Sequence, residues 1–323
     1  MGLNQKPSAI TVNRAYIGSP DSYFTKTFVP KLLEQGPFLM IFINQKPFVL
    51  KPSNASFFLR FILSLKANPL LKTASLIYWK YYTHHHHIPF LVFDSLNNPE
   101  LIGYLKDKEF ILSAGLHEKV NRNLLRACPN GLINFHYSLL PKYQGRFPVF
   151  WQCVQGDLEF GYTFHKMNER LDAGPILLQN KISISKESLN SENPVAAISD
   201  ELTLHASNQI YKIVRGVKEF DLENKSSNLF TKKDFIDFHK LNIDQTGLAW
   251  LEKCKVSKRF ILQDRYLIHL KPAGISNDST NQIRIHGMSL VISKDCRNFI
   301  IQSINYLPAF IYYFQIAKIV RNS

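Results

Sequence analysis

Residues 131–145 read GLINFHYSLLPKYQG and residues 169–177 read ERLDAGPIL, and these two stretches decide the fold. In the first stretch, apolar residues surround Asn134 and His136, which indicates a short buried strand. The two polar residues are two positions apart, so their side chains point to the same face of that strand. The strand therefore presents an amide and an imidazole together, just before a turn that contains proline.

This position at the end of a strand favours a ligand site. Ligands of open α/β sheets bind beyond the carboxyl ends of the strands. Asp172 follows in a loop beside Gly174, from which its carboxylate could approach His136. An isolated Asn and His at a strand end would more often only satisfy backbone groups, but here a characteristic turn and loop accompany them.

The motifs resemble the folate-dependent formyltransferase family. The resemblance rests on Asn134-x-His136, on Ser138-Leu-Leu-Pro141 with Gly145, and on Leu171-Asp172-Ala-Gly174. It implies transfer of a formyl group from 10-formyltetrahydrofolate, as co-substrate, to an amine, without a metal. Past residue 220 the resemblance fades.

The residue types suit this chemistry. Acyl transfer to an amine passes through a tetrahedral intermediate whose oxyanion needs hydrogen-bond donors. Asn134 offers an amide N–H and His136 a ring N–H. We expect Asp172 to orient His136, to bias it toward the imidazolium form, and to take the proton of the attacking amine. The predicted catalytic residues are therefore Asn134, His136 and Asp172.

The resemblance also implies where the folate donor lies. It places the donor beside the turn after the site strand, with one side on an apolar strand at residues 88–93. The residues expected to bind the donor are Ile88, Pro89, Phe90, Leu91, Ser138, Leu139, Leu140 and Pro141.

The alternation of strands and helices predicts the fold class. Strand-like and helix-like segments alternate from residue 9 to residue 136, which favours a Rossmann-like, doubly wound, mostly parallel sheet. No G-x-G-x-x-G motif is present, so no dinucleotide is expected. Residues 223–228 form a polar linker. We therefore predict a formyltransferase catalytic domain at 1–222 and a smaller β-rich domain at 229–323.

Length and composition set the broad class. The chain has 323 residues, of which 45% are hydrophobic, so it is globular and long enough for two domains. Its cysteines, at positions 128, 153, 254 and 296, show no metal-binding spacing and fit a reducing compartment. No apolar run is long enough to span a bilayer, and the N-terminus lacks a signal-peptide core. We expect a cytoplasmic protein, with a mitochondrial presequence left open. The four histidines at 84–87 are interpreted as a solvated loop.

The strongly basic charge leaves the acceptor open. The formal net charge is +14, which could reflect nucleic acid, an anionic surface, or a codon bias toward Lys, Asn, Ile and Phe. A basic β-rich domain resembles methionyl-tRNA formyltransferases, so methionyl-tRNA is the first candidate acceptor. The residues expected to hold the tRNA backbone are Lys253, Lys255, Lys258, Arg259 and Arg265.

Two departures favour a smaller acceptor. Residues 45–54, after the second strand, contain Lys46 and Lys51 but no glycine, whereas a basic glycine-rich loop is usual in the tRNA enzymes. Residues 146–151 are bulky where small residues are usual, which suggests a reshaped acceptor site. The alternatives are an N-formyltransferase for an amino-sugar nucleotide or another small amine, a formyltetrahydrofolate hydrolase, and a non-catalytic RNA-binding protein on the same scaffold.

Overall fold

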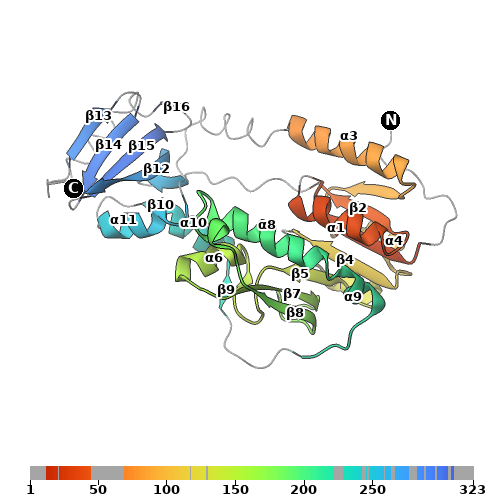
Figure 1. Ribbon diagram of the computed structural model, residues 1–323. Helices are drawn as coiled ribbons and strands as arrows, with labels where there is room; N and C mark the ends of the chain where they lie inside the picture. The colour runs from red at the N-terminus through yellow and green to blue at the C-terminus, as the bar shows by residue number, and fades with distance from the viewer. Residues whose placement is uncertain are drawn as a thin grey trace. The chain divides into compact units, whose positions relative to one another are not determined.

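The structure is a computed structural model. It describes residues 12–44, 69–221 and 228–308, apart from short gaps at 21, 117, 129, 242–244, 246, 258, 263–265, 276–281, 287–288, 295–296 and 305–306. Within these residues, one compact unit ends at Phe230 and a second begins at Thr231. The first is an α/β unit and the second a smaller β-rich unit, as the sequence predicts (Figure 1).

A seven-stranded sheet in the order β3-β2-β1-β4-β5-β7-β8 forms the centre of the first unit. Neighbouring strands run parallel from β3 to β5, whereas β7 is antiparallel to β5, and β8 to β7. β2 and β4 are buried at every position, which explains why they are apolar on both faces. The strands are β1 (Arg14–Gly18), β2 (Leu39–Ile43), β3 (Phe90–Phe93), β4 (Phe110–Ala114), β5 (Ile133–His136), β7 (Phe160–Lys166) and β8 (Ile176–Ile182).

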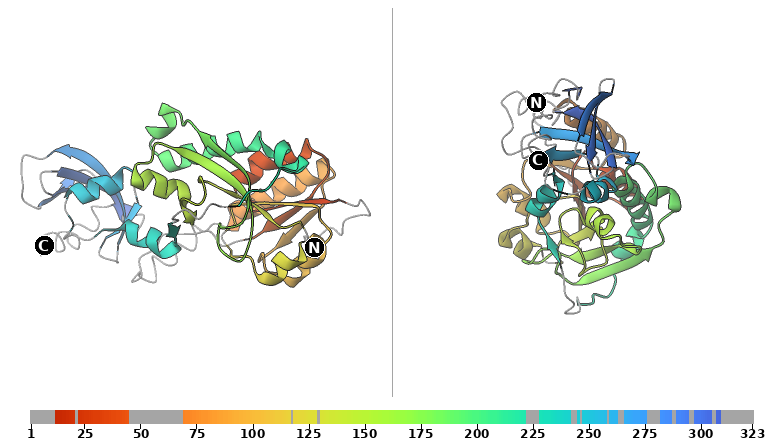
Figure 2. Two further views of the ribbon diagram at one scale, coloured as in Figure 1. Left: turned by 90° about the horizontal axis from the view of Figure 1, so that it is seen from below. Right: turned by 90° about the vertical axis from the view of Figure 1, so that its left-hand side faces the viewer.

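Helices cover both faces of this sheet. α1 (Tyr23–Leu33) packs against α8 (Pro194–Ser207) and α9 (Ile210–Arg215), and α4 (Pro99–Leu105) packs against α5 (Arg122–Ala127). The left view of Figure 2 shows α4 and α5 on the face opposite α1 and α8. The sheet is therefore doubly wound. The other helices of this unit are α3 (Pro69–His85), α6 (Pro148–Gln155) and α7 (Lys186–Leu189).

Polar caps fix where several helices begin. Asn98 accepts a hydrogen bond from the Glu100 N–H at the start of α4, and Pro99 fills the first turn. Asn121 accepts from the Leu124 N–H in the same way at α5. An uncapped helix end leaves N–H groups unpaired, and a side-chain cap is typically worth about 1 kcal/mol.

In its described residues, the second unit is a mainly antiparallel sheet with two short helices, α10 (Lys232–His239) and α11 (Gly247–Cys254). Its core contains Trp250, Phe260 and Phe299, all fully buried. Its strands are β10 (Lys240–Leu241), β11 (Arg259–Leu262), β12 (Tyr266–Ile275), β13 (Gln282–His286), β14 (Ser289–Lys294), β15 (Arg297–Ile304) and β16 (Leu307–Pro308).

Several element boundaries differ from the sequence predictions. A cap at Asn193-Pro194, followed by apolar residues at helical spacing, predicts one helix up to residue 215, but the structure has two, α8 and α9. Residues 232–253 also look helical in sequence, but β10 divides them. His84 and His85 belong to the end of α3 rather than to a loop, and the His85 ring stacks on Tyr81 one turn earlier. The loop expected at 45–54 and the helix expected at 55–66 lie outside the described residues.

In the ranges that the structure describes, no helix is long and apolar enough to cross a membrane.

Candidate active site

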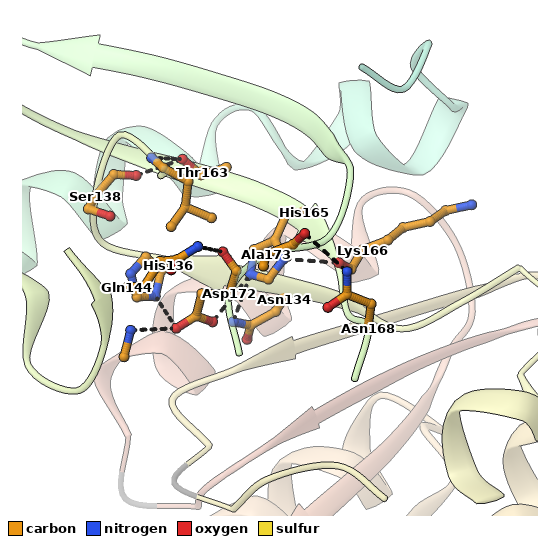
Figure 3. A network of polar contacts seen from close by, with 12 residues as sticks. Asn134, His136, Ser138, Gln144, Thr163, His165, Lys166, Asn168, Asp172 and Ala173 are labelled. Atoms are coloured by element: carbon orange, nitrogen blue, oxygen red, sulfur yellow. Dashed lines mark hydrogen bonds and ion pairs between the residues drawn. The ribbon is translucent and has the colours of Figure 1, made fainter. Parts of the chain in front are cut away.

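The register of three adjacent strands sets a row of polar side chains across one face of the sheet. Ser113 on β4 pairs with Asn134 on β5, and Asn134 pairs with His165 on β7. Directly paired residues of neighbouring strands project to the same face. His136 pairs in the same way with Thr163, so the imidazole and the amide have polar neighbours on β7. Figure 3 shows Asn134, His136 and His165 gathered around Asp172.

Hydrogen bonds hold the Asn134 amide in one orientation. The Ser113 hydroxyl donates to Asn134 Oδ1 over 3.3 Å, and Asn134 Nδ2 lies 3.3 Å from His165 Nε2. His165 Nδ1 donates to the Lys166 carbonyl over 3.0 Å, because a carbonyl oxygen can only accept. The amide N–H groups of Asn134 are therefore on the side of the cluster that faces the two histidines and Asp172.

His136 is buried and both of its ring nitrogens have partners. Nε2 donates to the Tyr143 carbonyl over 2.8 Å, and Nδ1 lies 3.6 Å from Asp172 Oδ2. Burial lowers the pKa of His136 below its ordinary value, and attraction to Asp172 only partly offsets this. Asp172 therefore does bias His136 toward imidazolium, as expected, but loss of hydration outweighs this attraction and the net effect is a lowered pKa.

Asp172 is the anion of the cluster. Its Oδ2 accepts the Gly145 N–H over 2.8 Å, and its Oδ1 lies 3.5 Å from His165 Nε2. Burial by itself would raise the pKa of Asp172, but His136, His165 and the Gly145 N–H together lower it to about 2. The carboxylate is thus ionised at neutral pH and is a weak base.

Close backbone packing fixes the position of the loop that carries Asp172. The loop joins β7 to β8, and Asp172 itself has a left-handed backbone with φ of 50°. A Cβ at Gly174 would lie 1.9 Å from the Lys166 carbonyl oxygen, so only glycine fits there. The Gln144 side chain donates to the Asp172 carbonyl over 2.9 Å. Left-handed non-glycine residues cost free energy and concentrate at functional sites.

The structure brings only part of the predicted folate-binding set near this cluster. Ser138, Leu139, Leu140 and Pro141 directly follow β5, and the Leu140–Pro141 peptide bond is cis. The Thr163 hydroxyl donates to the Ser138 carbonyl over 2.6 Å, which ties this turn to β7.

The other part is distant in the sheet. β3 is an edge strand, and β2, β1 and β4 lie between it and β5. Four spacings of about 4.8 Å put Ile88, Pro89, Phe90 and Leu91 roughly 19 Å from Asn134 across the sheet. The structure therefore does not bring these four residues to the cluster. The strand beside β5 is β4, which leads into Gly115 and Leu116.

Sequence reasoning missed four members of the cluster: Ser113, Tyr143, Gln144 and His165. The sequence does carry a signal for one of them. Residues 160–166 alternate, and Thr163 and His165 are the polar face of that strand. Pairing of this strand with the Asn134 strand would have pointed that polar face to the site. Tyr143 acts through its carbonyl oxygen, which no side-chain pattern reveals.

No metal centre is built by the described residues: no three of their His, Cys, Asp or Glu side chains are placed to hold an ion together.

Comparison with known proteins matches one segment of the chain to a family. Residues 86–200 match the family model "Formyl transferase", and this segment contains Asn134, His136 and Asp172. Among solved structures, an N-formyltransferase from Helicobacter canadensis, in complex with folinic acid and dTDP-3-aminofucose, is similar with a TM-score of 0.57 at 18% identity. The match covers 90% of this chain and 99% of that chain.

Two further structures share the fold. The sugar 3N-formyl transferase WlaRD, crystallised with dTDP and 5-N-formyl-THF, has a TM-score of 0.56 at 15% identity, over 90% of this chain and 97% of that one. HypX from Aquifex aeolicus, in complex with tetrahydrofolic acid, has a TM-score of 0.56 at 10% identity, over 90% of this chain and 44% of that one. At these identities the structures show a shared fold, and residues 86–200 are the part of this chain that is similar to the formyltransferase family.

Proposed function

We propose that the chain transfers a formyl group from 10-formyltetrahydrofolate to the amino group of a nucleotide-linked amino sugar. The observation that carries the proposal is the convergence of Asn134, His136 and Asp172, from β5 and the β7–β8 loop, on one face of the sheet. These groups supply an amide donor, an imidazole and a carboxylate, which acyl transfer to an amine requires.

Asn134 has the geometry of a fixed oxyanion donor. Its Oδ1 is held by Ser113 and one side of its Nδ2 by His165, so the amide is preorganised. A fixed donor costs no reorganisation when charge develops on the formyl oxygen, and loss of one such donor typically lowers kcat by about 100- to 1000-fold. We assign the oxyanion of the tetrahedral intermediate to Asn134.

His136 is better suited than Asp172 to accept the proton. With a pKa of about 2, Asp172 is too weak a base to deprotonate an amine efficiently. His136 Nε2 carries its proton toward Tyr143, so Nδ1 is the basic nitrogen of the neutral ring. Nδ1 takes a proton from the attacking amine, and the carboxylate 3.6 Å away stabilises the imidazolium that forms.

The atoms of the reaction then balance. The acceptor nitrogen forms a bond to the formyl carbon and loses one proton. The bond between that carbon and N10 of the folate breaks, and N10 receives a proton as tetrahydrofolate leaves. We place the folate beside residues 138–141 and the end of β4 at Gly115, because both directly adjoin β5.

An amino-sugar nucleotide is preferred to methionyl-tRNA as the acceptor. Two of the solved formyltransferase structures with this fold carry dTDP or a dTDP-amino sugar. Of the five cations expected to hold tRNA, only Lys253 and Lys255 have described side chains. Lys253 donates to the Lys240 carbonyl over 2.6 Å, and Lys255 pairs with Glu252 at 2.7 Å. Both ammonium groups thus already have partners within the second unit.

The test is an acceptor panel with the full-length protein. 10-Formyltetrahydrofolate is combined in turn with dTDP-3-amino and dTDP-4-amino sugars, methionyl-tRNA and buffer alone, and tetrahydrofolate release and the formylated product are followed by mass spectrometry. We expect formylated sugar nucleotide from the wild type, and a loss of most of kcat in Asn134→Ala and His136→Ala. Formate release without an acceptor would instead identify a hydrolase. Absence of any folate turnover would refute the enzyme assignment.

A further inference from the structure

A short pair of strands joins the candidate site to a segment far along the chain. β6 (Gln144–Gly145) runs parallel to β9 (Leu229–Phe230), although more than eighty residues separate them. The Arg146 N–H donates to the Phe230 carbonyl over 2.9 Å. A Cβ at Gly145, whose φ is +95°, would lie 2.2 Å from the Phe230 carbonyl oxygen. The two backbones are therefore in direct contact.

The same loop, residues 143–145, also holds the side chains of His136 and Asp172. The Tyr143 carbonyl accepts from His136 Nε2, the Gln144 side chain donates to the Asp172 carbonyl, and the Gly145 N–H donates to Asp172 Oδ2. Three consecutive residues thus fix the imidazole and the carboxylate relative to each other. A shift of this loop would move both groups together.

The Phe230 ring anchors the same loop through its side chain. It stacks on Trp151 with ring centroids 4.5 Å apart and an angle of 16°, and on Tyr143 at 5.9 Å and 15°. Such stacked aromatic pairs stabilise a structure beyond the apolar area that they bury. The Tyr143 hydroxyl lies 2.6 Å from Asp157 Oδ2, so the Tyr143 side chain is held at its face and at its tip.

The backbone of this loop needs such support. Tyr143 has a left-handed conformation with φ of 57°, and Phe147 another with φ of 60°. Non-glycine residues in this region are strained and persist only when their surroundings hold them. Without the Phe230 stack and the β9 backbone, the loop would relax toward ordinary backbone angles.

We propose that Phe230 is a positioning residue: its ring and backbone clamp residues 143–145, and the clamped loop holds His136 and Asp172 in place for formyl transfer. Phe230 touches neither side chain itself. The expected effect on kcat rests on the proposed function, whereas the contact between Phe230 and residues 143–145 can be measured separately. No pattern in the sequence points to this role, since Phe230 lies beyond the residues that match the family model.

The experiment compares Phe230→Ala, Phe230→Leu and Phe230→Tyr in the full-length protein with the wild type. The matched control is Phe220→Ala, because Phe220 is also partly exposed and also backbone-paired, to Ile176, but away from the loop. Hydrogen exchange of the Gly145 and Arg146 amides reports the clamp, and steady-state kinetics with 10-formyltetrahydrofolate and a dTDP-amino sugar report its consequence. Thermal unfolding identifies any variant that fails to fold.

In Phe230→Ala we expect both amides to exchange at least about tenfold faster. We expect kcat to fall roughly 10- to 100-fold, because small misplacements of catalytic groups cost that much, while KM for the folate changes little. Phe230→Tyr should restore both, and Phe220→Ala should match the wild type. If the alanine variant does not fold, Phe230→Leu, which keeps apolar volume without a ring, takes its place.

Two results would overturn the proposal. One is a folded Phe230→Ala or Phe230→Leu whose kcat and amide exchange stay within about twofold of the wild type. The other is a loss of kcat with unchanged exchange at Gly145 and Arg146. A wild type that transfers no formyl group to any acceptor would refute the proposed function instead, and the exchange rates would still decide whether the clamp exists.

Discussion

Asp172 Oδ2 accepts the backbone N–H of Gly145 over 2.8 Å, although 27 residues separate the two in the chain. This bond ties the β7–β8 loop to the loop after β5. It also helps to keep the buried carboxylate ionised, because a hydrogen bond to the charged form lowers the pKa. The bond therefore both fixes the position of the Asp172 carboxylate and helps to keep it ionised.

The low pKa of Asp172 predicts an acid-dependent contribution to stability. The folded pKa of about 2 lies below the ordinary value of 3.8, so the carboxylate stabilises the fold above about pH 4. The contribution is lost as the pH falls through about 2. We expect Asp172→Asn to lower the free energy of unfolding by about 2 kcal/mol at neutral pH.

Urea unfolding of the wild type and Asp172→Asn between pH 7 and about pH 3 checks this. The difference between the two proteins should fall to about half at the acid end, as the carboxyl group of the unfolded wild type becomes protonated. A difference that stays constant over this range would mean that Asp172 stabilises the fold through its shape and hydrogen bonds and not through its charge.

His165 should matter for the reaction although it is not in the predicted triad. Its Nε2 lies 3.3 Å from Asn134 Nδ2 and 3.5 Å from Asp172 Oδ1, so the ring packs between the oxyanion donor and the anion and fixes their positions. We expect His165→Ala to lower kcat by roughly 10- to 100-fold, with a smaller change in KM. His165→Gln, which keeps a polar group at this position, should recover part of the loss.

The double variant Asn134→Ala/His165→Ala makes this prediction sharper. If His165 acts by orienting Asn134, the two losses should be strongly non-additive, because removing the amide also removes what the imidazole supports. Additive losses would instead assign His165 an independent role. The measurement is kcat for both single variants and the double variant under saturating folate and acceptor.

Part of this arrangement could be predicted from the sequence and part could not. The alternating pattern and the position of Asn134 and His136 at a strand end predict the sheet and the face that carries the site. Some of the predicted folate-binding residues lie on or next to β3, because β3 and β4 are both short apolar strands and look alike in sequence. Only the order of strands in the sheet shows that β4, and not β3, lies beside β5. The Tyr143 carbonyl and the β9 clamp are backbone features of distant segments. Backbone contacts between distant segments leave no recognisable pattern of residue types in the sequence.

We expect Gly174→Ala to be destabilised and inactive. A Cβ there would lie 1.9 Å from the Lys166 carbonyl oxygen, which is a backbone atom that cannot move aside cheaply. Gly174→Ala should therefore displace the Asp172 loop, lower the free energy of unfolding by about 1–3 kcal/mol, and abolish most of kcat. Thermal unfolding and kinetics with the same preparation measure both effects.

Gly103 provides the matched control. It lies in α4, and a Cβ added at this position would meet no atom within 4 Å. Gly103→Ala should stabilise the protein by about 0.5–1 kcal/mol, because alanine loses less backbone entropy in a helix. Unchanged kcat in Gly103→Ala beside a large loss in Gly174→Ala would localise the effect to the site. Equal losses in both would contradict the explanation by steric contact.

The acceptor can be identified by the salt dependence of its binding. A tRNA held through phosphates would lose affinity steeply with salt, because each neutralised phosphate releases counterions. A nucleotide amino sugar makes few such contacts, so its KM should change only about threefold or less between roughly 50 and 200 mM salt, conditions under which a protein with about 6–10 phosphate contacts typically loses about 10³-fold or more.

Two matched variants, each lacking one lysine, distinguish between these acceptors. Lys255 is exposed and pairs with Glu252 at 2.7 Å in the second unit, and Lys31 is partly exposed and pairs with Glu34 at 2.9 Å in the first. Both pairs are surface contacts between residues three apart, and each is worth little for stability. If the second unit holds tRNA, Lys255→Ala should flatten the slope of log K against log salt by roughly one, whereas Lys31→Ala should leave it unchanged. We expect neither variant to alter KM for the amino-sugar nucleotide. A steep salt slope for methionyl-tRNA that Lys255→Ala reduces, together with formylation of that tRNA, would replace the amino-sugar assignment.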